Sequence, residues 1–489
     1  MTKSGKIASI IAGPLAAILI SLFTDLDTNN PAVSKTAAIA VWMAIWWVTE
    51  AVPLAVTSLI PIFIFPFLGI LGTKEVAPHY MNHLVFLFIG GFIVAFAMEK
   101  WNLHKRIALN IITTIGSSPS RILLGFMLAS YFLSMWMLNT STTMILLPTV
   151  LAIIFKLKQV MDESHHKKYS TALLLGIAFS SSIGGTATLI GTAPNLVMLQ
   201  HYSNAFPNNP EISFLKWFSF GFPVSLIFLS ITYLIFKQIY CRFSINIDKC
   251  TAIFKKEKEE LGGISYEEKV VGIILFVMAI LWFTRANIDV GAFKIMGWSN
   301  LFPNPKFITD STVAIFMSSL LFVIPSKQNK GSMVMDWNAV KNLPFGIILL
   351  FGGGFALAEG FIQSGLSDWL ASSLTSLKGL SPLLVVIIIC SFMTFATELT
   401  SNTATTQLIL PILIVVAHVT DIDPILLMIP ATFSASYAFM LPVATPPNAI
   451  VFGSEMISIK EMARVGVILN IVGVILMTLA MFTLGKFVF

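Results

Sequence analysis

Apolar stretches recur along the whole chain, and most approach the length that a helix needs to cross a membrane. About 20 apolar residues span the hydrocarbon layer as an α-helix, and residues 7–23, 36–52 and 84–100 come near that length. Only 11% of the residues are charged, whereas soluble domains carry roughly 25%. The weak alternation typical of a membrane β-barrel is absent. The sequence therefore predicts an all-α polytopic membrane protein without a soluble catalytic domain.

The basic residues indicate how the chain is oriented. With the N-terminus in the cytoplasm, 22 of the 30 Lys and Arg residues fall on the cytoplasmic face, which is the positive-inside pattern. The net charge of +6 therefore reflects orientation in a cell (plasma or inner) membrane, with the C-terminus outside, and not a nucleic-acid partner. Cys241, Cys250 and Cys390 lack the spacing of a metal site or a disulfide set.

Two polar segments interrupt the apolar sequence where leucine would be expected. The first is residues 139–143, Asn-Thr-Ser-Thr-Thr, and the second is residues 402–406, Asn-Thr-Ala-Thr-Thr, which Thr397, Glu398, Thr400 and Ser401 precede. Each lies at the centre of an apolar region bounded by polar or cationic residues. The region 121–156 is either two full spans or a re-entrant hairpin with the polar segment at its tip. We favour the hairpin, because non-helical backbone at membrane depth is tolerated where protein or a cavity surrounds it.

Two later segments contain the residues that interrupt helices. Residues 184–195 include three glycines, one of them Gly191, together with Thr192, Pro194 and Asn195. Residues 441–448 include three prolines, Thr445 and Asn448. Glycine and proline in the middle of an apolar stretch predict a broken transmembrane helix. Each broken helix follows one of the polar segments.

The second half of the chain repeats the first. Gly353 and Asn402 match Gly90 and Asn139 at a separation of 263 residues (402 minus 139), whereas Asn448 matches Asn195 at 253. An odd number of spans between equivalent points predicts that the repeats are inverted in the membrane. The whole pattern predicts about 11 transmembrane helices and two re-entrant hairpins.

The paired polar segments are candidate binding sites, because buried polar groups at bilayer depth are costly without partners. Amide, hydroxyl and backbone oxygens suit a hard cation such as Na⁺, and free helix N-termini suit a carboxylate. No Lys or Arg occurs in residues 123–155, 174–200, 380–420 or 425–458. An anionic ligand would therefore need helix ends, amides, hydroxyls and co-bound cations, which favours sodium coupling.

Simpler interpretations exist for individual residues. Ser and Thr are common at helix contacts in membranes, although that explains two matched segments less well than one. Glu398 is either a proton or cation carboxylate or a structural residue, and His165 and His166 are expected in a solvated loop. Trp101 is expected at headgroup depth, and His104 and His418 near the membrane interface. No His or Cys accompanies the polar segments, so an enzyme is not indicated, whereas an anion channel is a remote alternative.

The motifs resemble those of the divalent anion/sodium symporter family over nearly the whole chain. The resemblance rests on residues 46–54, residues 99–106, both polar segments and, most specifically, residues 436–448 with the sequence SYAFMLPVATPPN. It implies a homodimeric di- or tricarboxylate transporter for substrates such as succinate, malate and fumarate. In such a transporter a mobile part carries both hairpins and both broken helices across the membrane, as an elevator, beside a fixed scaffold.

The resemblance also implies domains and site residues. Residues 1–119 and 270–380 would be scaffold, 120–243 and 381–489 the transport regions, and 244–269 a cytoplasmic linker. Substrate contacts would come from Asn139, Thr140, Thr192, Ser401, Asn402, Thr403, Thr445 and Pro446. One sodium site would use Ser134, Asn139 and Gly191, and the other Thr397, Thr400, Asn402 and Ala444.

One position departs from the family pattern. The Ser-Asn-Thr motif is intact at residues 401–403, but the first copy begins with Leu138. The missing hydroxyl removes a possible ligand of substrate and of the first sodium ion. Sodium symport is the main hypothesis, and sodium-independent exchange of dicarboxylates (for example 2-oxoglutarate against succinate) is the alternative.

Overall fold

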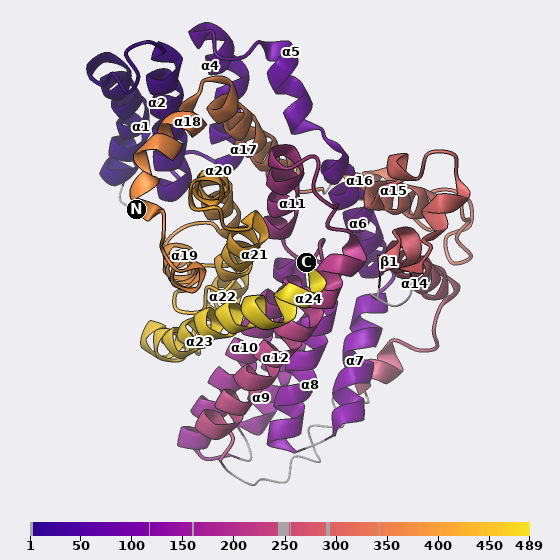
Figure 1. Ribbon diagram of the computed structural model, residues 1–489. Helices are drawn as coiled ribbons and strands as arrows, with labels where there is room; N and C mark the ends of the chain where they lie inside the picture. Colours follow the sequence, from indigo (N-terminus) through magenta and orange to yellow (C-terminus); the bar gives the residue numbers. More distant parts are fainter. Residues whose placement is uncertain are drawn as a thin grey trace.

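Helices make up almost all of the regular structure in a computed structural model of the chain (Figure 1). The structure describes residues 3–116, 118–158, 161–242, 254, 256–289, 294–341 and 343–489. Cys250 and much of the predicted linker lie outside these residues. The first half contains α1 (Lys3–Phe23), α2 (Pro31–Thr49), α3 (Leu54–Thr57), α4 (Ile60–Leu68), α5 (Thr73–Val76), α6 (His83–Lys100), α7 (Leu103–Ile115), α8 (Pro119–Ser134), α9 (Asn139–Leu157), α10 (Glu163–Gly185), α11 (Ala193–Ala205) and α12 (Phe214–Tyr240).

The second half has a similar series of helices and one small pair of strands. The strands β1 (Ile288–Asp289) and β2 (Lys294–Ile295) pair antiparallel, with Ile288 opposite Ile295. The helices are α14 (Tyr266–Arg285), α15 (Asp310–Leu320), α16 (Trp337–Val340), α17 (Phe345–Gln363), α18 (Leu366–Ser373), α19 (Pro382–Ala396), α20 (Asn402–Thr420), α21 (Pro424–Ala435), α22 (Pro446–Phe452), α23 (Ile459–Ala480) and α24 (Lys486–Val488). Short 3₁₀ turns occur at Ala77–Tyr80, Trp298–Leu301, Pro305–Phe307 and Thr375–Leu377, and a π-helical turn at Met481–Gly485.

Polar caps start several helices earlier than the apolar pattern predicts. The apolar pattern alone would start three spans near residues 220, 270 and 465, whereas the helices begin at Phe214, Tyr266 and Ile459. In each case the preceding serine accepts a hydrogen bond from the backbone N–H three residues later. Such caps satisfy N–H groups that have no partner within the helix, so the helix extends into a polar segment.

The stretch 99–106 contains the end of one helix and the start of the next. Helix α6 ends at Lys100, Asn102 adopts a left-handed conformation with φ 58°, and α7 begins at Leu103. Trp101 is buried and its Nε1 donates to the Val334 carbonyl at 2.8 Å, and so it packs inside the protein. His104 is also buried, with Nδ1 2.8 Å from the Met98 carbonyl. Both side chains are thus held by contacts within the protein, and their depth in the membrane stays a prediction.

Among the described residues, eight helices are long and apolar enough to cross a membrane. Shorter apolar helices occupy Leu54–Leu68, Pro382–Ala396 and Pro424–Ala435. The last two belong to the second predicted hairpin and the second predicted broken helix. The predicted total of 11 spans stays a prediction.

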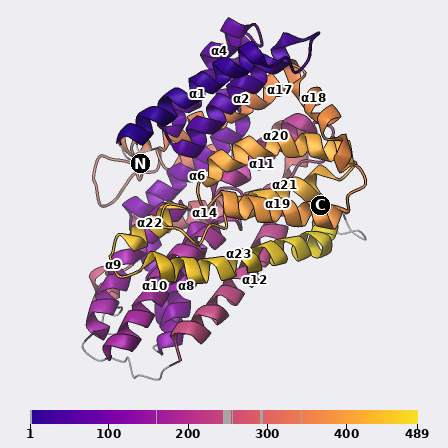
Figure 2. The ribbon, with the colours of Figure 1, turned by 90° about the vertical axis from the view of Figure 1, so that its left-hand side faces the viewer.

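In the part of the chain that the structure describes, the buried side chains form two separate hydrophobic clusters. The smaller cluster joins α2, α4, α17 and α18, and includes Trp47, Phe65 and Leu357. Figure 1 shows these helices together with α1 at one end of the molecule, whereas α7 to α10 and α12 extend from the other. Figure 2 shows α19 to α23 crossing the region between the two ends. There the two repeats are in contact, because α22 packs against α9 and α10, and α11 packs against α20.

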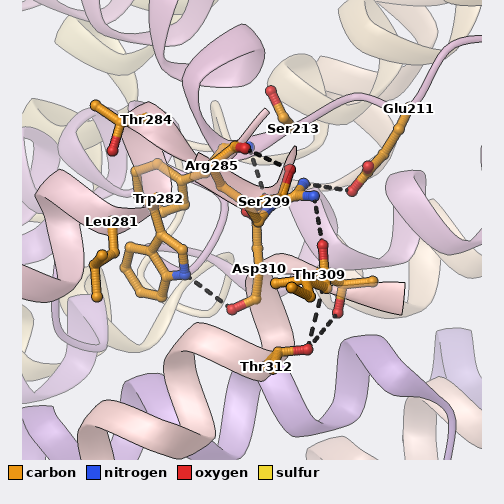
Figure 3. Close-up of polar contacts among 12 residues, drawn as sticks. Glu211, Ser213, Leu281, Trp282, Thr284, Arg285, Ser299, Thr309, Asp310 and Thr312 are labelled. Carbon is orange, nitrogen blue, oxygen red and sulfur yellow. Dashed lines mark hydrogen bonds and ion pairs between the residues drawn. The ribbon is translucent and has the colours of Figure 1, made fainter. Parts of the chain in front are cut away.

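A buried arginine joins three segments that are distant in sequence (Figure 3). Arg285 at the end of α14 donates from Nε to Asp310 Oδ1 at 2.6 Å and from Nη2 to Glu211 Oε1 at 2.7 Å. Its side chain is 4% exposed and that of Asp310 is 7% exposed. The other Asp310 oxygen accepts from the Phe214 N–H at 2.8 Å. The cluster thus connects the starts of α12 and α15 to the end of α14.

Replacing Arg285 with methionine is expected to lower the free energy of unfolding by about 3–5 kcal/mol, because the Asp310 carboxylate would stay buried without its cation. The matched control is Lys100→Met, which removes an ion pair to Asp336 whose side chains are 28% and 47% exposed. Such an exposed pair contributes about 0–1 kcal/mol. Thermal unfolding in detergent measures both variants. Equal losses would contradict the structural role of the buried cluster.

Candidate functional site

Two helix pairs have matching tips. Helices α8 and α9 are joined by residues 135–138, and α19 and α20 by residues 397–401. Ser134 Oγ bonds to Asn139 Oδ1 and lies 2.7 Å from the Ser181 carbonyl. Thr397 Oγ1 lies 2.7 Å from Asn402 Oδ1 and 2.8 Å from the Ala435 carbonyl. We name these triplets of oxygens the first and the second oxygen cluster.

Each oxygen cluster has more acceptors than protons. A hydroxyl carries one proton, yet Ser134 and Thr397 each face two acceptor oxygens at hydrogen-bond distance. In each cluster, one of the two acceptor oxygens therefore receives no proton from the hydroxyl. Oxygen-rich clusters of this kind are what hard cations prefer as ligands.

Glycines at the first break bring a third predicted residue to the first oxygen cluster. A Cβ atom on Gly185 would lie 2.6 Å from Asn139 Oδ1 and 3.1 Å from the Gly191 carbonyl. A Cβ atom on Gly191 would lie 2.9 Å from the Ser134 carbonyl. The structure thus brings together Ser134, Asn139 and Gly191, which the resemblance had grouped as one sodium site.

The residues grouped as the second sodium site are less uniformly placed. Thr397 and Asn402 are in direct contact. Thr400 Oγ1 instead bonds to the Ala396 carbonyl at 3.0 Å and to Thr405 Oγ1. Ala444 is buried in the second break, where its N–H donates to the Leu441 carbonyl at 3.2 Å. Only Thr397 and Asn402 of this group are joined by a hydrogen bond.

Both helix breaks are held by an equivalent asparagine. Asn195 Nδ2 donates to the carbonyls of Gly185 and Thr188 at 3.1 and 2.7 Å. Asn448 Nδ2 donates to those of Ala438 and Leu441, both at 3.1 Å. These contacts satisfy carbonyls that an interrupted helix leaves free. Asn195 and Asn448 were predicted only as repeat landmarks, and their matching places in the two breaks, 253 residues apart, were the available signal for a shared role.

The predicted substrate residues lie at helix starts. Asn139, Thr140, Ser401, Asn402 and Thr403 are half-buried at the starts of α9 and α20, whereas Thr192 and Thr445 are buried and Pro446 is exposed. Helices α9, α20 and α11 begin without a side-chain cap. The first three N–H groups of α9 and of α20 are available to an anion, which the helix dipole also favours. In α11 the second residue is Pro194, and the Asn195 N–H donates to the Thr192 carbonyl at 3.3 Å.

After each break, the second half of the broken helix packs on the hairpin of the other repeat. Helix α10 packs against α8 and α9 of its own repeat, and α21 against α19 and α20. Beyond the breaks, α11 packs against α20 of the other repeat and α22 against α9. His201 of α11 and Gln407 of α20 are buried and joined by a hydrogen bond of 2.8 Å. Thr192 and Thr445 are thereby placed at starts of helices that pack on the opposite hairpin.

Leu138 is directed toward apolar neighbours. It lines a small cavity together with Gly91, Phe92, Ala95 and Ile190. The side chain therefore occupies an apolar environment where the family motif has a hydroxyl.

Sequence comparison agrees with these motifs. The family profile described as the sodium:sulfate symporter transmembrane region matches residues 7–489. The sodium-dependent dicarboxylate transporter SdcS of Staphylococcus aureus (strain bovine RF122 / ET3-1) is 44% identical over 489 residues, which covers 98% of this chain and 91% of SdcS. SdcS of strain NCTC 8325 is 43% identical with the same coverage.

Solved structures share the fold at low sequence identity. MtrF of Neisseria gonorrhoeae, from a class of antimetabolite efflux pumps, has a TM-score of 0.58 with 12% identity, and the match covers 96% of each chain. The YdaH transporter of Alcanivorax borkumensis has a TM-score of 0.56 with 12% identity over 84% of this chain and 87% of YdaH. These likenesses concern the transporter fold alone. Because the profile and the SdcS match both extend over almost all of its length, the chain belongs to the sodium:sulfate symporter family, the divalent anion/sodium symporters that its motifs resemble.

Proposed function

We propose that the chain takes up C4-dicarboxylates such as succinate, malate and fumarate, with Na⁺ as the coupling ion. The observation that carries the proposal is the pair of oxygen clusters, in each of which one hydroxyl faces two acceptors. A sodium ion there would accept oxygen ligands that a single proton leaves unsatisfied. The 44% identity to the sodium-dependent dicarboxylate transporter SdcS supports both the ion and the substrate class.

Charge balance supports coupling of the anion to a cation. A C4-dicarboxylate carries two negative charges, and residues 123–155, 174–200, 380–420 and 425–458 contain no Lys or Arg. Uncapped helix starts and Asn and Thr side chains can orient carboxylates, but they supply only partial positive charge. Sodium ions bound beside the substrate would supply the remaining positive charge. Binding of sodium would then favour binding of the dicarboxylate, and the reverse.

In the proposed transport cycle, a mobile part of the protein moves relative to a fixed scaffold. The hairpins and broken helices would move as one body beside the helices of the smaller hydrophobic cluster and α6, α14 and α15, which would act as the scaffold. The hairpins would be re-entrant, because α8 and α19 have only 16 and 15 residues. We also propose a homodimer with cytoplasmic N-termini.

The test is uptake of radiolabelled succinate into proteoliposomes with sodium or choline chloride outside. Symport predicts accumulation that requires the sodium gradient. Uptake that is indifferent to sodium but stimulated by internal dicarboxylate would contradict symport and establish exchange. Substrate-independent currents would indicate a channel.

Leu138→Ser is expected to lower the sodium concentration for half-maximal uptake by about fivefold, which corresponds to one added hydroxyl interaction of about 1 kcal/mol. The change would restore the hydroxyl next to Asn139. Leu138→Ala is the matched control, because it removes the same apolar bulk without adding a hydroxyl. If serine and alanine have equal effects on sodium dependence, Leu138 is silent for coupling.

A further inference from the structure

Glu398 is a buried carboxylate at the second tip to which the proposed transport mechanism assigns no role. Its side chain is 3% exposed. Oε1 accepts from the N–H groups of Phe439 and Met440 at 2.7 and 2.9 Å, and Oε2 accepts from those of Met440 and Leu441 at 3.0 and 3.1 Å. Asn470 Nδ2 of α23 donates to Oε1 at 2.7 Å. The carboxylate is thus bonded to three consecutive backbone N–H groups and one amide.

These bonds fix the backbone of the second break from one side, while Asn448 fixes it from the other. The N–H groups of residues 439–441 point to Glu398, and the carbonyls of Ala438 and Leu441 accept from Asn448. Little of this backbone is left free to rearrange. The segment lies between Ala435, whose carbonyl belongs to the second oxygen cluster, and Thr445.

Glu398 also directly follows Thr397, the hydroxyl of the second oxygen cluster. The same turn of the hairpin therefore presents Thr397 to the cluster and Glu398 to the break. Any shift of the break would change the distance between Thr397 Oγ1 and the Ala435 carbonyl, which is 2.8 Å.

In the first repeat, the corresponding backbone at the break is held by neutral groups. The residue equivalent to Glu398 is Met135, at the separation of 263 residues that relates the two hairpins. There the Met135 carbonyl accepts from Thr188 Oγ1 at 2.5 Å, and Trp217 Nε1 donates to the Thr186 carbonyl at 3.1 Å. The two oxygen clusters are therefore supported by different chemistry.

We propose that Glu398 is a positioning residue for the cation at the second oxygen cluster, held in place by Asn470, and that the first cluster has no equivalent carboxylate. This inference rests on the proposed function, because it takes the clusters as sodium sites. Hydrogen bonds to a charged acceptor are stronger than those to a neutral one. Glu398→Gln keeps the shape of the side chain but removes the charge and one acceptor oxygen, so the break is held less firmly.

The expected result for Glu398→Gln is a rise of about tenfold in the sodium concentration for half-maximal succinate uptake, equivalent to a loss of about 1.4 kcal/mol. The KM for succinate at saturating sodium should change less than about twofold. Asn470→Ala removes one of the four donors and should shift the sodium dependence in the same direction by a smaller factor. Met135→Leu, the matched change in the first repeat, should leave it unaltered.

A second measurement does not depend on transport. Sodium chloride, compared with choline chloride, should raise the Tm of the purified protein, because a ligand that binds the folded state stabilises it. Glu398→Gln should reduce this sodium-induced rise while retaining most of the Tm in choline. If wild type shows no sodium effect on Tm or uptake, both the proposed function and this inference fail.

The inference about Glu398 fails while the proposed function stands if Glu398→Gln lowers the maximal rate of uptake or the Tm in choline, but its sodium concentration for half-maximal uptake equals that of wild type. That outcome would assign Glu398 to folding only. If Glu398→Gln cannot be purified, Asn470→Ala is tested instead, by the sodium dependence of uptake and by the sodium-induced rise in Tm.

Discussion

Asn402→Ala is expected to reduce sodium-driven succinate uptake at least about tenfold while the protein remains folded, because hydrogen bonds or ligand contacts to charged groups contribute about 1.5–3 kcal/mol each. Asn402 Oδ1 is part of the second oxygen cluster, 2.7 Å from Thr397 Oγ1. The residue is also the first of α20, which begins without a side-chain cap. One substitution therefore removes a proposed sodium ligand and a proposed substrate contact. Initial rates of uptake into proteoliposomes at several sodium concentrations measure the effect.

The matched control for Asn402 is Asn204→Ala. Asn204 lies near the end of α11, is exposed and accepts a hydrogen bond from Gln200 at 2.6 Å. Its replacement should leave uptake within about twofold of wild type, since surface substitutions generally have small effects. Uptake by Asn402→Ala at the level of this control would refute the proposed role of the second oxygen cluster.

Gly185→Ala is expected to lower uptake by roughly one to two orders of magnitude, because overpacking costs about 1–3 kcal/mol. The added methyl would lie 2.6 Å from Asn139 Oδ1 and 3.1 Å from the Gly191 carbonyl. Those oxygens must move apart to admit it, which would disrupt the first oxygen cluster. Helix α10 itself should tolerate the change, because alanine favours helix more than glycine does. Sodium half-saturation is expected to rise together with the loss of rate.

Gly272→Ala is the corresponding control in α14. A methyl there would have Leu103 Cδ2 at 3.8 Å as its neighbour, an ordinary van der Waals contact. Uptake should therefore match wild type. If Gly185→Ala behaves in the same way, the first oxygen cluster is not required for transport.

The internal repeat let the sequence predict much of the candidate site. The tips at Asn139 and Asn402 and the breaks before Asn195 and Asn448 appear as polar or helix-breaking residues in apolar surroundings. The tips are separated by 263 residues and the breaks by 253. The structure places these residues at helix starts and joins Ser134 to Asn139 and Thr397 to Asn402. The local chemistry of hydroxyls, amides, glycine and proline was sufficient for those predictions.

Other features of the site and of the fold had no signal in the sequence. The carbonyls of Ser181 and Ala435 belong to residues whose side chains indicate nothing about their backbone oxygens. The burial of Trp101 and His104 against the Val334 and Met98 carbonyls was likewise not indicated by the sequence. Hydrophobicity alone would place the starts of α12 and α23 after Phe214 and Ile459, because it does not register the polar caps before them.

The sequence by itself determined the membrane-protein class, the two repeats, the polar tips and the broken helices, because each depends on composition or spacing along one stretch. Only the tertiary structure decided how the repeats combine: α11 packs on the hairpin of the second repeat, and α22 on that of the first. It likewise decided that Glu398 bonds the backbone of residues 439–441 and that Arg285 joins Asp310 and Glu211. Such contacts link residues far apart in sequence, and their partners are set by the packing of whole helices.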